Sequence, residues 1–429
     1  MREMKDSGIE WIGEIPCDWK LERSQWHLEE INISNNPVQT NNVLSLTNKL
    51  GVVPYEEKGN QGNKSKENVY EYKLAYPNTI VANSMNILIG SVGLCDYFGC
   101  VSPVYYVFRA KKYNNIKFLN YVFQTVGFQR ELRKYANGIL EIRLRVSSSD
   151  MLKRFIPFPS EIEQQRIAEF LDRECGKIDG LKADIQAQID TLEKYKRSII
   201  TETVTHGLNP SVPMKNSGIP WVDEVSQNWD IRRVKYIATC LKKGNGITKE
   251  DIVEGGDTLC IRYGEIYTKY NLSFFECTTR TNKERISSKQ YFTQGDILFA
   301  GTGELIEEIG KNIVYLGTDD CLAGGDIIIL KHKQNARYLN YALNSECVQA
   351  QKSCNKAKLK VVHISAFEIG NIKIALPPLD EQQEIADYLD NKCAEIEQII
   401  ADKKSQIETL DGYKKSLIFE YVTGKKEVV

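Results

Sequence analysis

The sequence lacks several features that define common classes of protein. It contains no run of eighteen apolar residues, so no segment is predicted to cross a membrane as a helix. Its start, MREMKDSGIE, has no apolar stretch of the kind found in secretory signal peptides. Its eleven cysteines are odd in number, scattered, and contain no C-x-x-C pair. These absences predict a reduced, cytoplasmic protein with free thiols and no membrane contact.

The patterns of common catalytic and metal sites are also missing. The four histidines form no metal-spaced group with the cysteines, and no G-x-x-x-x-G-K-[ST] loop for ATP occurs. The run FAGTGE (299–304) resembles the cofactor loop of a methyltransferase, but the [ND]-P-P-[YFW] motif that holds a flipped base is absent. A tight turn is the simpler interpretation of its glycines. We therefore predict no catalytic residue, no metal site and no cofactor in this chain, which makes it a non-enzyme.

The charge is nearly balanced overall but strongly segregated along the chain. The 429 residues carry a net charge of −1, and 42% apolar residues indicate globular domains. Residues 20–154 hold 18 basic and 11 acidic side chains, and residues 230–376 hold 21 and 17. Residues 161–203 hold 7 basic and 10 acidic side chains, and residues 380–422 hold 5 and 11. Basic and acidic parts therefore alternate, and the net charge says little about binding partners.

The alternation follows an internal repeat. The opening SGIEWIGEIPCDW (7–19) returns as SGIPWVDEVSQNW (217–229). A stronger repeat relates residues 161–205 to 379–423, where 22 of 45 positions are identical at an offset of 218. A duplication of this length is too long for a solenoid repeat. The chain is thus two copies of one unit: a short Trp-containing opener, a variable basic block and a long acidic segment.

The two acidic segments are predicted to be long helices. PSEIEQQ and PPLDEQQ place prolines and acidic residues at their starts, where the helix dipole favours negative charge. Apolar residues then recur every seven positions, as in a coiled coil. We expect the two helices to pair antiparallel, because one such stripe alone stays exposed; the alternative is that each helix lies on its own block. The predicted core of the pair is Leu171, Ile178, Leu181, Ile185, Leu192, Tyr195 and Ile199 with Leu389, Ile396, Ile399, Leu410, Tyr413 and Leu417.

The variable blocks are predicted to be mixed α/β, which makes the fold α+β. Short β-prone runs such as YPNTIVANSMNILIG alternate with polar, Gly-rich loops, and an amphipathic helix is expected near the end of each block. The predicted fold is two repeated mixed α/β domains joined by a long antiparallel two-helix coiled coil. Its expected divisions are 1–158 (opener and first block), 159–206 (first helix), 207–376 (linker, opener and second block) and 377–429 (second helix and tail).

These features resemble the specificity subunit of a type I restriction-modification system over essentially the whole chain. The resemblance is carried by the doubled opener, the doubled P-x-x-EQQ-x-IA-x-[FY]LD helix start, and the segments GDILFAGTGE…IGK (295–311) and MNILIGSVGL…VSPVYYVF (85–108). It implies two target-recognition domains that each read one half of a bipartite DNA sequence, separated by the helix pair. It also implies two copies of a modification methyltransferase subunit, which hold S-adenosylmethionine, and a restriction/translocase subunit that uses ATP and Mg. The target bases do not transfer with the resemblance.

Residues suited to DNA contact occur in both blocks. Lys and Arg suit phosphate or guanine, Asn and Gln suit adenine, and FAGTGE is a candidate loop near DNA. Ordinary solvated loops, salt-bridged surfaces and core aromatics are the alternatives. The candidates are Lys58, Asn60, Gln61, Asn63, Lys64, Lys66, Asn86, Arg143 and Arg145 in the first block, and Arg262, Tyr263, Lys269, Thr302, Lys311, Lys356, Lys358 and Lys360 in the second.

Two near-identical helix starts and two VT helix ends predict two equal docking surfaces for one kind of partner. The candidate partner-binding residues are Glu163, Gln164, Gln165, Glu381, Gln382 and Gln383. The alternative is that EQQ caps its helix and supports the adjacent block. At the level of function, the competing hypothesis is a coiled-coil scaffold that binds two identical partners without DNA sequence specificity.

Overall fold

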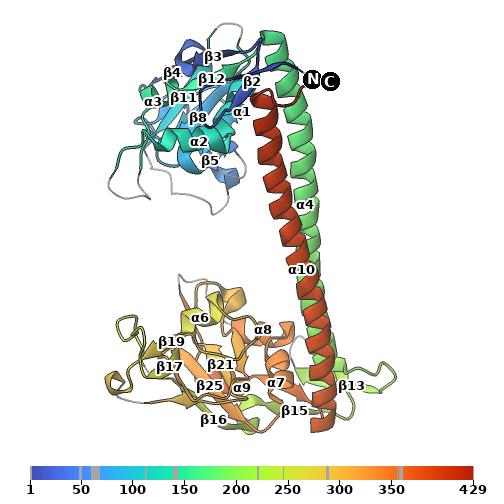
Figure 1. The fold of residues 1–429 in the computed structure, drawn as a ribbon. Coiled ribbons are helices and arrows are strands. Elements are labelled where there is room, and N and C mark those ends of the chain that lie inside the picture. Colours follow the sequence, from blue (N-terminus) through green and yellow to red (C-terminus); the bar gives the residue numbers. More distant parts are fainter. Residues whose placement is uncertain are drawn as a thin grey trace. The chain divides into compact units, whose positions relative to one another are not determined.

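The chain folds into two compact units. The structure is a computed structural model, and it describes residues 2–428 apart from 48–50, 59–67, 112–113, 139–143, 220–221, 245, 287–288, 355 and 357–360. Unit 1 comprises Met1–Gln186 and Lys404–Val429, and unit 2 comprises Ala187–Lys403. Each unit holds one mixed α/β block and one segment of each long helix, α4 (Glu161–His206) and α10 (Leu379–Val422) (Figure 1). In the described ranges no helix is both long and apolar enough to span a membrane.

The block of unit 1 is built on a four-stranded antiparallel sheet. The strand order is β4-β11-β8-β9, and α1 packs against β8 and β9. The strand β8 is buried at every position because it lies inside the sheet and under this helix. The elements of the block are β1 (Met4–Asp6), β2 (Glu14–Pro16), β3 (Lys20–Arg23), β4 (Leu28–Ile31), β5 (Leu44–Thr47), β6 (Gly51–Pro54), β7 (Lys73–Ala75), β8 (Thr79–Asn83), β9 (Val92–Cys95), β10 (Gly99–Val101), β11 (Tyr105–Ala110), α1 (Ile116–Gln124), α2 (Val126–Arg133), α3 (Ser148–Leu152) and β12 (Phe155–Phe158).

The block of unit 2 repeats this frame. Its main sheet has the order β16-β25-β21-β23-β18, and α7 packs against β23. The elements are β13 (Met214–Ile219), β14 (Val222–Ser226), β15 (Asp230–Arg233), α5 (Val234–Ile237), β16 (Ala238–Lys243), β17 (Thr258–Ile261), α6 (Tyr263–Thr268), β18 (Ser273–Phe274), β19 (Thr279–Thr281), β20 (Tyr291–Phe292), β21 (Ile297–Ala300), β22 (Thr302–Gly303), β23 (Asn312–Tyr315), β24 (Cys321–Ala323), β25 (Ile327–His332), α7 (Ala336–Leu343), α8 (Glu346–Ser353), β26 (Val362–His363), α9 (Ala366–Asn371) and β27 (Lys373–Leu376).

The two blocks therefore share one topology although their sequences diverge. The first four strands of the unit 2 sheet follow the same order along the chain as β4-β11-β8-β9. Unit 2 adds β18 at the edge and a separate sheet of order β19-β17-β24-β20. The predicted mixed α/β character of both blocks agrees with this arrangement.

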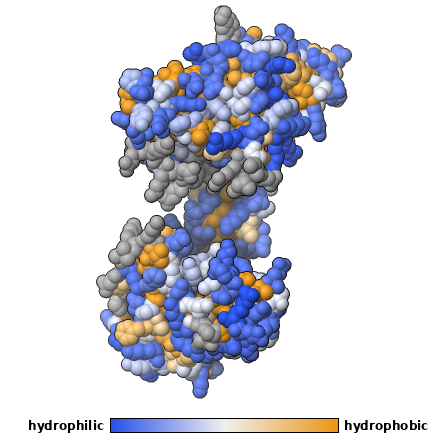
Figure 2. Space-filling view, turned by 90° about the vertical axis from the view of Figure 1, so that its left-hand side faces the viewer, coloured by the Kyte–Doolittle hydropathy of each residue, from blue (hydrophilic) through white to orange (hydrophobic). Residues whose placement is uncertain are grey.

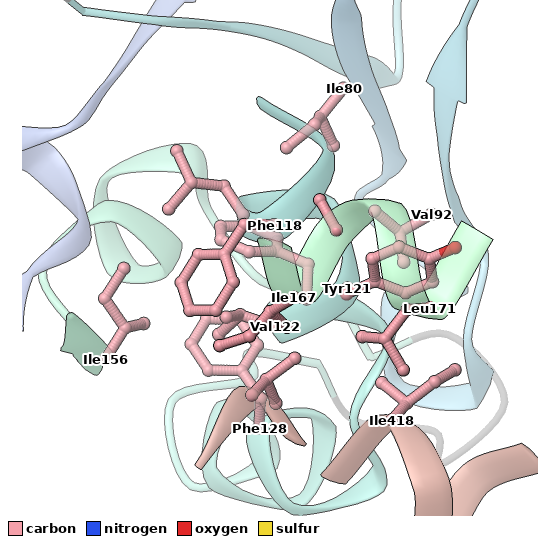
Figure 3. Packing of buried hydrophobic residues seen from close by; sticks show 14 of the residues in the cluster. Ile80, Val92, Phe118, Tyr121, Val122, Phe128, Ile156, Ile167, Leu171 and Ile418 are labelled. Carbon is pink, nitrogen blue, oxygen red and sulfur yellow. The ribbon is translucent and has the colours of Figure 1, made fainter. Parts of the chain in front are cut away.

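The core of unit 1 joins the block to both long helices. Side chains of α1 and α2 such as Phe118 and Phe128 pack with Ile167 and Leu171 of α4 and Ile418 of α10 (Figure 3). All five are buried. At about 25 cal/mol per Å² of buried apolar surface, a cluster of this size is the main stabilising term of the unit. The start of α4 and the end of α10 are consequently part of the domain core.

Segments of α4 and α10 pack antiparallel within each unit. In unit 1, Asp179 pairs with Lys414 at 2.6 Å, and Lys182 pairs with Asp411. In unit 2, Lys196 pairs with Glu397. Asp179 and Glu397 occupy equivalent repeat positions, as do Lys414 and Lys196, so both units use the same pairing register.

The contact stripe along the two helices differs in part from the predicted one. In a coiled coil each heptad has two contact positions, so each seven-spaced residue has a second contact residue either three or four positions after it. In these helices the second contact residue lies four positions after each predicted seven-spaced residue, at i+4. The buried or partly buried residues at these i+4 positions are Cys175, Lys182, Ile189, Lys196, Thr203, Cys393, Ile400, Lys414 and Tyr421.

Four of the predicted core residues are wrong for this reason. Leu181, Tyr195, Ile399 and Tyr413 stand at i+3 and are 52%, 55%, 44% and 56% exposed. Among the other predicted core residues, Leu171, Ile178, Ile199, Leu389, Ile396 and Leu417 are buried, and Ile185, Leu192 and Leu410 are partly buried. Lys403, which interrupts the apolar stripe, is itself partly buried and donates to Gln188.

Candidate nucleic-acid interface

The repeated opener fastens each block to the start of a long helix. The buried Trp19 donates its indole N–H to Glu163 Oε2 at 2.9 Å, and Trp229 donates to Glu381 Oε2 at 3.0 Å. Arg2 also binds Glu163, at 2.5 Å from Oε1. The opener recurs in the sequence because this contact between opener and helix start, here called the structural bracket, forms twice, once in each unit.

The first glutamine of each EQQ motif also joins the start of the long helix to the adjacent block. Gln164 accepts the backbone N–H of Asn115 at 3.0 Å and donates to Pro159 O at 3.1 Å. Gln382 makes the matching bonds, accepting from Asn335 N at 3.0 Å and donating to Pro377 O at 2.9 Å. Both glutamines are buried. Predicting Gln164 and Gln382 as partner-binding residues was therefore wrong, because a buried amide that is already hydrogen-bonded within the chain offers no surface to a partner. Their contacts agree with the alternative hypothesis, in which EQQ supports the adjacent block.

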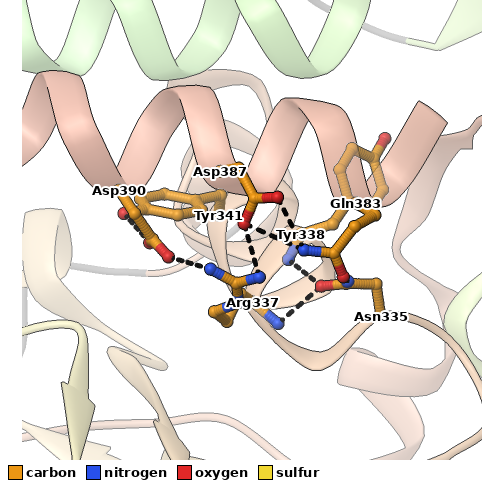
Figure 4. A network of polar contacts seen from close by, with 7 residues as sticks. All are labelled: Asn335, Arg337, Tyr338, Tyr341, Gln383, Asp387 and Asp390. Atoms are coloured by element: carbon orange, nitrogen blue, oxygen red, sulfur yellow. Dashed lines mark hydrogen bonds and ion pairs between the residues drawn. The ribbon is translucent and has the colours of Figure 1, made fainter. Parts of the chain in front are cut away.

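The second glutamine lies at an exposed rim. Gln383 accepts a hydrogen bond from Asn335 Nδ2 at 2.7 Å and donates to Asp387 (Figure 4). The Asp387 carboxylate also forms an ion pair with Arg337 at 2.7 Å. The amide of Gln383, and after it the guanidinium of Arg337, lower the pKa of Asp387. Tyr341 donates to Asp390 at 2.8 Å, as Tyr121 does to Asp172 in unit 1. Partner binding by Gln165 and Gln383 stays a prediction, as it does for Glu163 and Glu381.

The VT ends of the helices are buried and do not form exposed docking surfaces. Val204, Thr205, Val422 and Thr423 are buried. The glycines that follow them, Gly207 and Gly424, have φ of +81° and +71° and pack beside Trp229 and Trp19. Only glycine adopts this conformation without strain and leaves room for the indole ring. Each helix end therefore lies against an opener.

Two sequence-predicted segments meet at one edge of each block. In unit 2, β22 pairs with β26, and Thr302 Oγ1 lies 3.1 Å from His363 Nδ1. In unit 1, Val146 N donates to Ser84 O at 3.0 Å, and Arg145 pairs through its backbone with Asn137. The loop between β8 and β9 in unit 1, and between β21 and β23 in unit 2, thus lies beside the segment that precedes α3 or α9. Asn86 and Arg145, both exposed, belong to this surface in unit 1, and Thr302 and Lys356 belong to it in unit 2.

The helix α6 brings three further candidates to the same edge of unit 2. Tyr267 of α6 donates to Glu308 O at 3.3 Å, which joins the helix to the loop that carries Thr302. Arg262 and Tyr263 begin this helix, and Tyr263 is exposed. Lys269 follows its end, bound to Glu265 at 2.5 Å. DNA contact by Arg262, Tyr263 and Lys269 remains a prediction.

Several lysine ammonium groups are already bound within the chain. Lys311 donates to Tyr270 O at 3.1 Å, and burial lowers its pKa. Lys356 donates to His363 O at 2.7 Å and pairs with Glu368. Lys58 is only 6% exposed, with its Nζ 4.2 Å from the centre of the Tyr55 ring, so predicting it as an exposed DNA contact was wrong.

Some predicted DNA-contact residues lie outside the described residues: Asn60, Gln61, Asn63, Lys64, Lys66, Arg143, Lys358 and Lys360. Arg145 was predicted from alternating arginines that suggest a strand over 141–150; in the described part of this segment Arg145 forms a single bridge and α3 begins at Ser148, so the strand prediction is wrong there. The roles of Trp19, Trp229, Asn115 and Asn335 were not predicted from the sequence, in which the repeated tryptophans were the available signal. No group of three or more potential metal ligands occurs among the residues with described positions.

Comparison with known proteins agrees with this architecture. A family profile described as "Type I restriction modification DNA specificity domain" matches residues 226–409. The type I restriction enzyme MjaVIII specificity subunit of Methanocaldococcus jannaschii is 24% identical over 279 residues, covering 64% of this chain and 62% of the relative. The StySPI specificity subunit of Salmonella potsdam is 19% identical over 74% of this chain and 67% of its own length.

A solved structure is similar over nearly the whole fold. It was determined in a study of complex assembly and conformational transition of the type I R-M system, and it aligns with a TM-score of 0.69 at 14% identity, covering 96% of this chain and 99% of its own. At this identity the similarity shows the fold. Residues 226–409 are similar to a type I DNA specificity domain. The chain is similar to the specificity subunits of type I restriction-modification systems. It spans 62% and 50% of the lengths of two specificity subunits from M. jannaschii.

Proposed function

We propose that this chain is the DNA-reading subunit of a type I restriction-modification complex. Each mixed α/β block contacts one half of a bipartite target, and the antiparallel pair of long helices joins the blocks and sets the gap. The observation that supports this most is the doubled edge: the loop between β8 and β9 in unit 1, and between β21 and β23 in unit 2, lies beside the segment before α3 or α9, but with different side chains. A shared frame with unlike side chains suits two readers of unlike half-sites. Catalysis belongs to partner subunits that bring S-adenosylmethionine, ATP and Mg.

Exchange of one block tests independent reading. When residues 20–155 are replaced by the block of another specificity subunit, one half of the methylated sequence is expected to change, because each block carries its own contact surface. Genome-wide methylation mapping with the partner subunits present measures this outcome. Alteration of both halves would contradict independent reading. Equal affinity of the complex for every duplex would favour the scaffold hypothesis instead.

The same mapping tests the role of the helices. Insertion of seven residues in both α4 and α10, beside the midpoint of each, lengthens a helix by about 10 Å and preserves the seven-residue stripe. The gap is expected to lengthen by about 3 base pairs, at about 3.4 Å each, while both half-sites stay the same. An altered half-site at an unchanged gap would refute the spacer role.

The exposed i+3 residues provide a docking surface for the methyltransferase subunits. In an antiparallel pair, equivalent positions of the two helices lie on the same face. Leu181 with Tyr413 in unit 1, and Ile399 with Tyr195 in unit 2, therefore form two similar exposed apolar pairs. Figure 2 shows hydrophobic side chains scattered among hydrophilic ones on the described surface. A surface that occurs twice with the same chemistry fits two copies of one partner.

Charge substitutions test this docking. Tyr195→Glu and Tyr413→Glu are each expected to reduce the bound methyltransferase from two copies to one, because a carboxylate is costly in an apolar contact. The complex is reconstituted from the purified chain and methyltransferase, and its mass is measured. Ala187→Glu, an exposed position on the outward side of α4, is the matched control and should leave two copies bound. Two copies bound to the Tyr195→Glu, Tyr413→Glu double variant would refute this surface.

A further inference from the structure

Unit 2 contains an open groove of about 640 Å³ beside α6, and its lining includes Arg262 and Tyr263, two of the residues predicted from the sequence to contact DNA. Three segments of the chain line it, and they come from the loop after β16, the start of α6 and the turn between β24 and β25. The lining residues are Lys243, Gly246, Ile247, Thr248, Lys249, Arg262, Tyr263, Gly264, Gly324, Gly325 and Asp326.

The charged side chains of the groove leave it positive. Asp326 is the one carboxylate among the described lining residues, and Lys243 pairs with it at 3.0 Å. Lys249 and Arg262 contribute two further positive charges. The nearby Asp251 carboxylate already accepts the backbone N–H and hydroxyl of Thr248, at 2.7 and 2.9 Å. A groove of this kind attracts an anion.

Arg262 has an unused donor at this groove. Its Nε is buried and has no hydrogen-bond partner within the part of the chain that is described. An unpaired buried donor costs about 1–3 kcal/mol, so such a group in a native protein calls for an explanation. The planar guanidinium presents paired donors that match the oxygens of a phosphate. Because Arg262 lines the groove, phosphate oxygens there would accept hydrogen bonds from its guanidinium.

Glycines shape the groove for a bulky anion. A Cβ on Gly244 would lie 2.3 Å from Gly324 O, so the two loops approach each other backbone to backbone. Gly246 and Gly264 have no atom within 4 Å of the position of a Cβ and are open to the groove. The ligand can therefore approach the main chain closely. Tyr263 is exposed at the rim and offers a ring face for a sugar or base.

The groove is continuous with the edge that carries Thr302. Gly301, the residue before Thr302, donates its N–H to Asp326 O at 2.7 Å. The turn that lines the groove therefore also holds the loop of the candidate nucleic-acid interface. An anion bound in the groove would lie next to whatever that loop contacts.

We propose that this groove binds a phosphodiester of the DNA backbone. Arg262 donates to the phosphate oxygens, Lys249 neutralises the charge, and Tyr263 lies against the adjacent sugar or base. Such a contact fixes the position of the block on the duplex and carries no sequence information of its own. The assignment rests on the proposed DNA-reading function.

The test measures duplex binding by the complex of the full chain with its methyltransferase subunits. Arg262→Gln and Lys249→Gln are each expected to weaken binding on the order of tenfold, to target and scrambled duplexes alike. Each should also lower the slope of log K against log salt by about one phosphate contact. Lys249 is exposed, so Lys249→Gln keeps the test valid should Arg262→Gln fail to fold. Lys333→Gln, at an exposed lysine outside the groove, is the control.

The outcomes separate the groove from the function. A wild-type complex that prefers no duplex would refute the DNA-reading function itself. A selective wild-type complex whose affinity and salt slope are unchanged by Lys249→Gln would refute only the groove. Loss confined to the target duplex would make Arg262 a base reader and overturn the phosphate assignment. Displacement of DNA by millimolar inorganic phosphate at constant ionic strength, abolished by Lys249→Gln, would identify the site as one for free phosphate and likewise overturn it.

Discussion

Replacement of Leu171 with alanine is expected to lower the free energy of unfolding by about 2–5 kcal/mol, because the side chain is fully buried and its loss leaves a cavity. Leu171 belongs to the core cluster that joins α1 and α2 to both long helices, together with Cys175, Ile178 and Ile418. Urea unfolding of the full chain, followed by circular dichroism and tryptophan fluorescence, measures the loss.

Leu181→Ala is the matched control on the same helix. Leu181 is half exposed and stands at an i+3 position of the stripe, so its truncation should change the free energy of unfolding by no more than about 0.5 kcal/mol. Both variants replace leucine with alanine in the same helix, so the change in helix propensity is the same in both. An equal loss from both variants would mean that the helices pack through the i+3 positions, contrary to the structure.

A strong pH dependence is expected from Lys352, a buried lysine of α8. Its Nζ donates to Asn312 Oδ1 and Leu343 O, both at 2.8 Å, so its two hydrogen-bond acceptors are neutral. Burial lowers the pKa of Lys352 to about 7. Below pH 7 the ammonium is charged in both the folded and the unfolded chain, and the cost of its burial is present in full.

Stability should therefore rise with pH above 7. Between pH 7 and the ordinary lysine pKa of about 10.4, the unfolded chain binds more protons than the folded chain, so the free energy of unfolding increases. The expected gain from this group between pH 7 and pH 9 is about 2 kcal/mol. Above the ordinary pKa the gain is complete and the curve levels off.

The comparison with Lys352→Met isolates this effect. Methionine has a similar length and no charge, so the variant should lose the rise between pH 7 and pH 9 that the natural chain shows. The measurement is the free energy of unfolding of both proteins at pH 6, 7, 8 and 9, and the quantity of interest is their difference. Parallel curves over this range would show that Lys352 does not titrate as its surroundings imply.

The long helices illustrate how far sequence periodicity can predict packing. Proline, acidic residues and the seven-residue stripe predicted two long helices, and the structure places them at Glu161–His206 and Leu379–Val422. The same stripe left the second seam position open, because an apolar residue follows some seven-spaced residues at three positions, as Leu181 does, and others at four, as Ile189 does. Tyr195 was predicted to be buried because it occupies an intermediate position of the seven-residue stripe, whereas packing selected Lys196, whose aliphatic stem is covered while its ammonium pairs with Glu397.

The EQQ motif shows the converse case. Its repetition was evident in the sequence, but repetition alone does not distinguish a docking surface from a structural bracket. Only the positions of Asn115 and Asn335, which are distant in sequence, decide that Gln164 and Gln382 are buried. The glutamines therefore serve the blocks of their own chain.

The sequence by itself determined the duplication, the two helices, the mixed α/β blocks and the resemblance to a family, since each of these depends on local composition, on periodicity, on identity at a fixed offset or on short motifs. Only the tertiary structure decided the shared strand order of the two divergent blocks, the i+4 contacts of the helices and the groove beside α6. The physical reason is that these features arise from contacts between residues far apart in the chain, where burial and hydrogen bonding select among patterns that are locally equivalent.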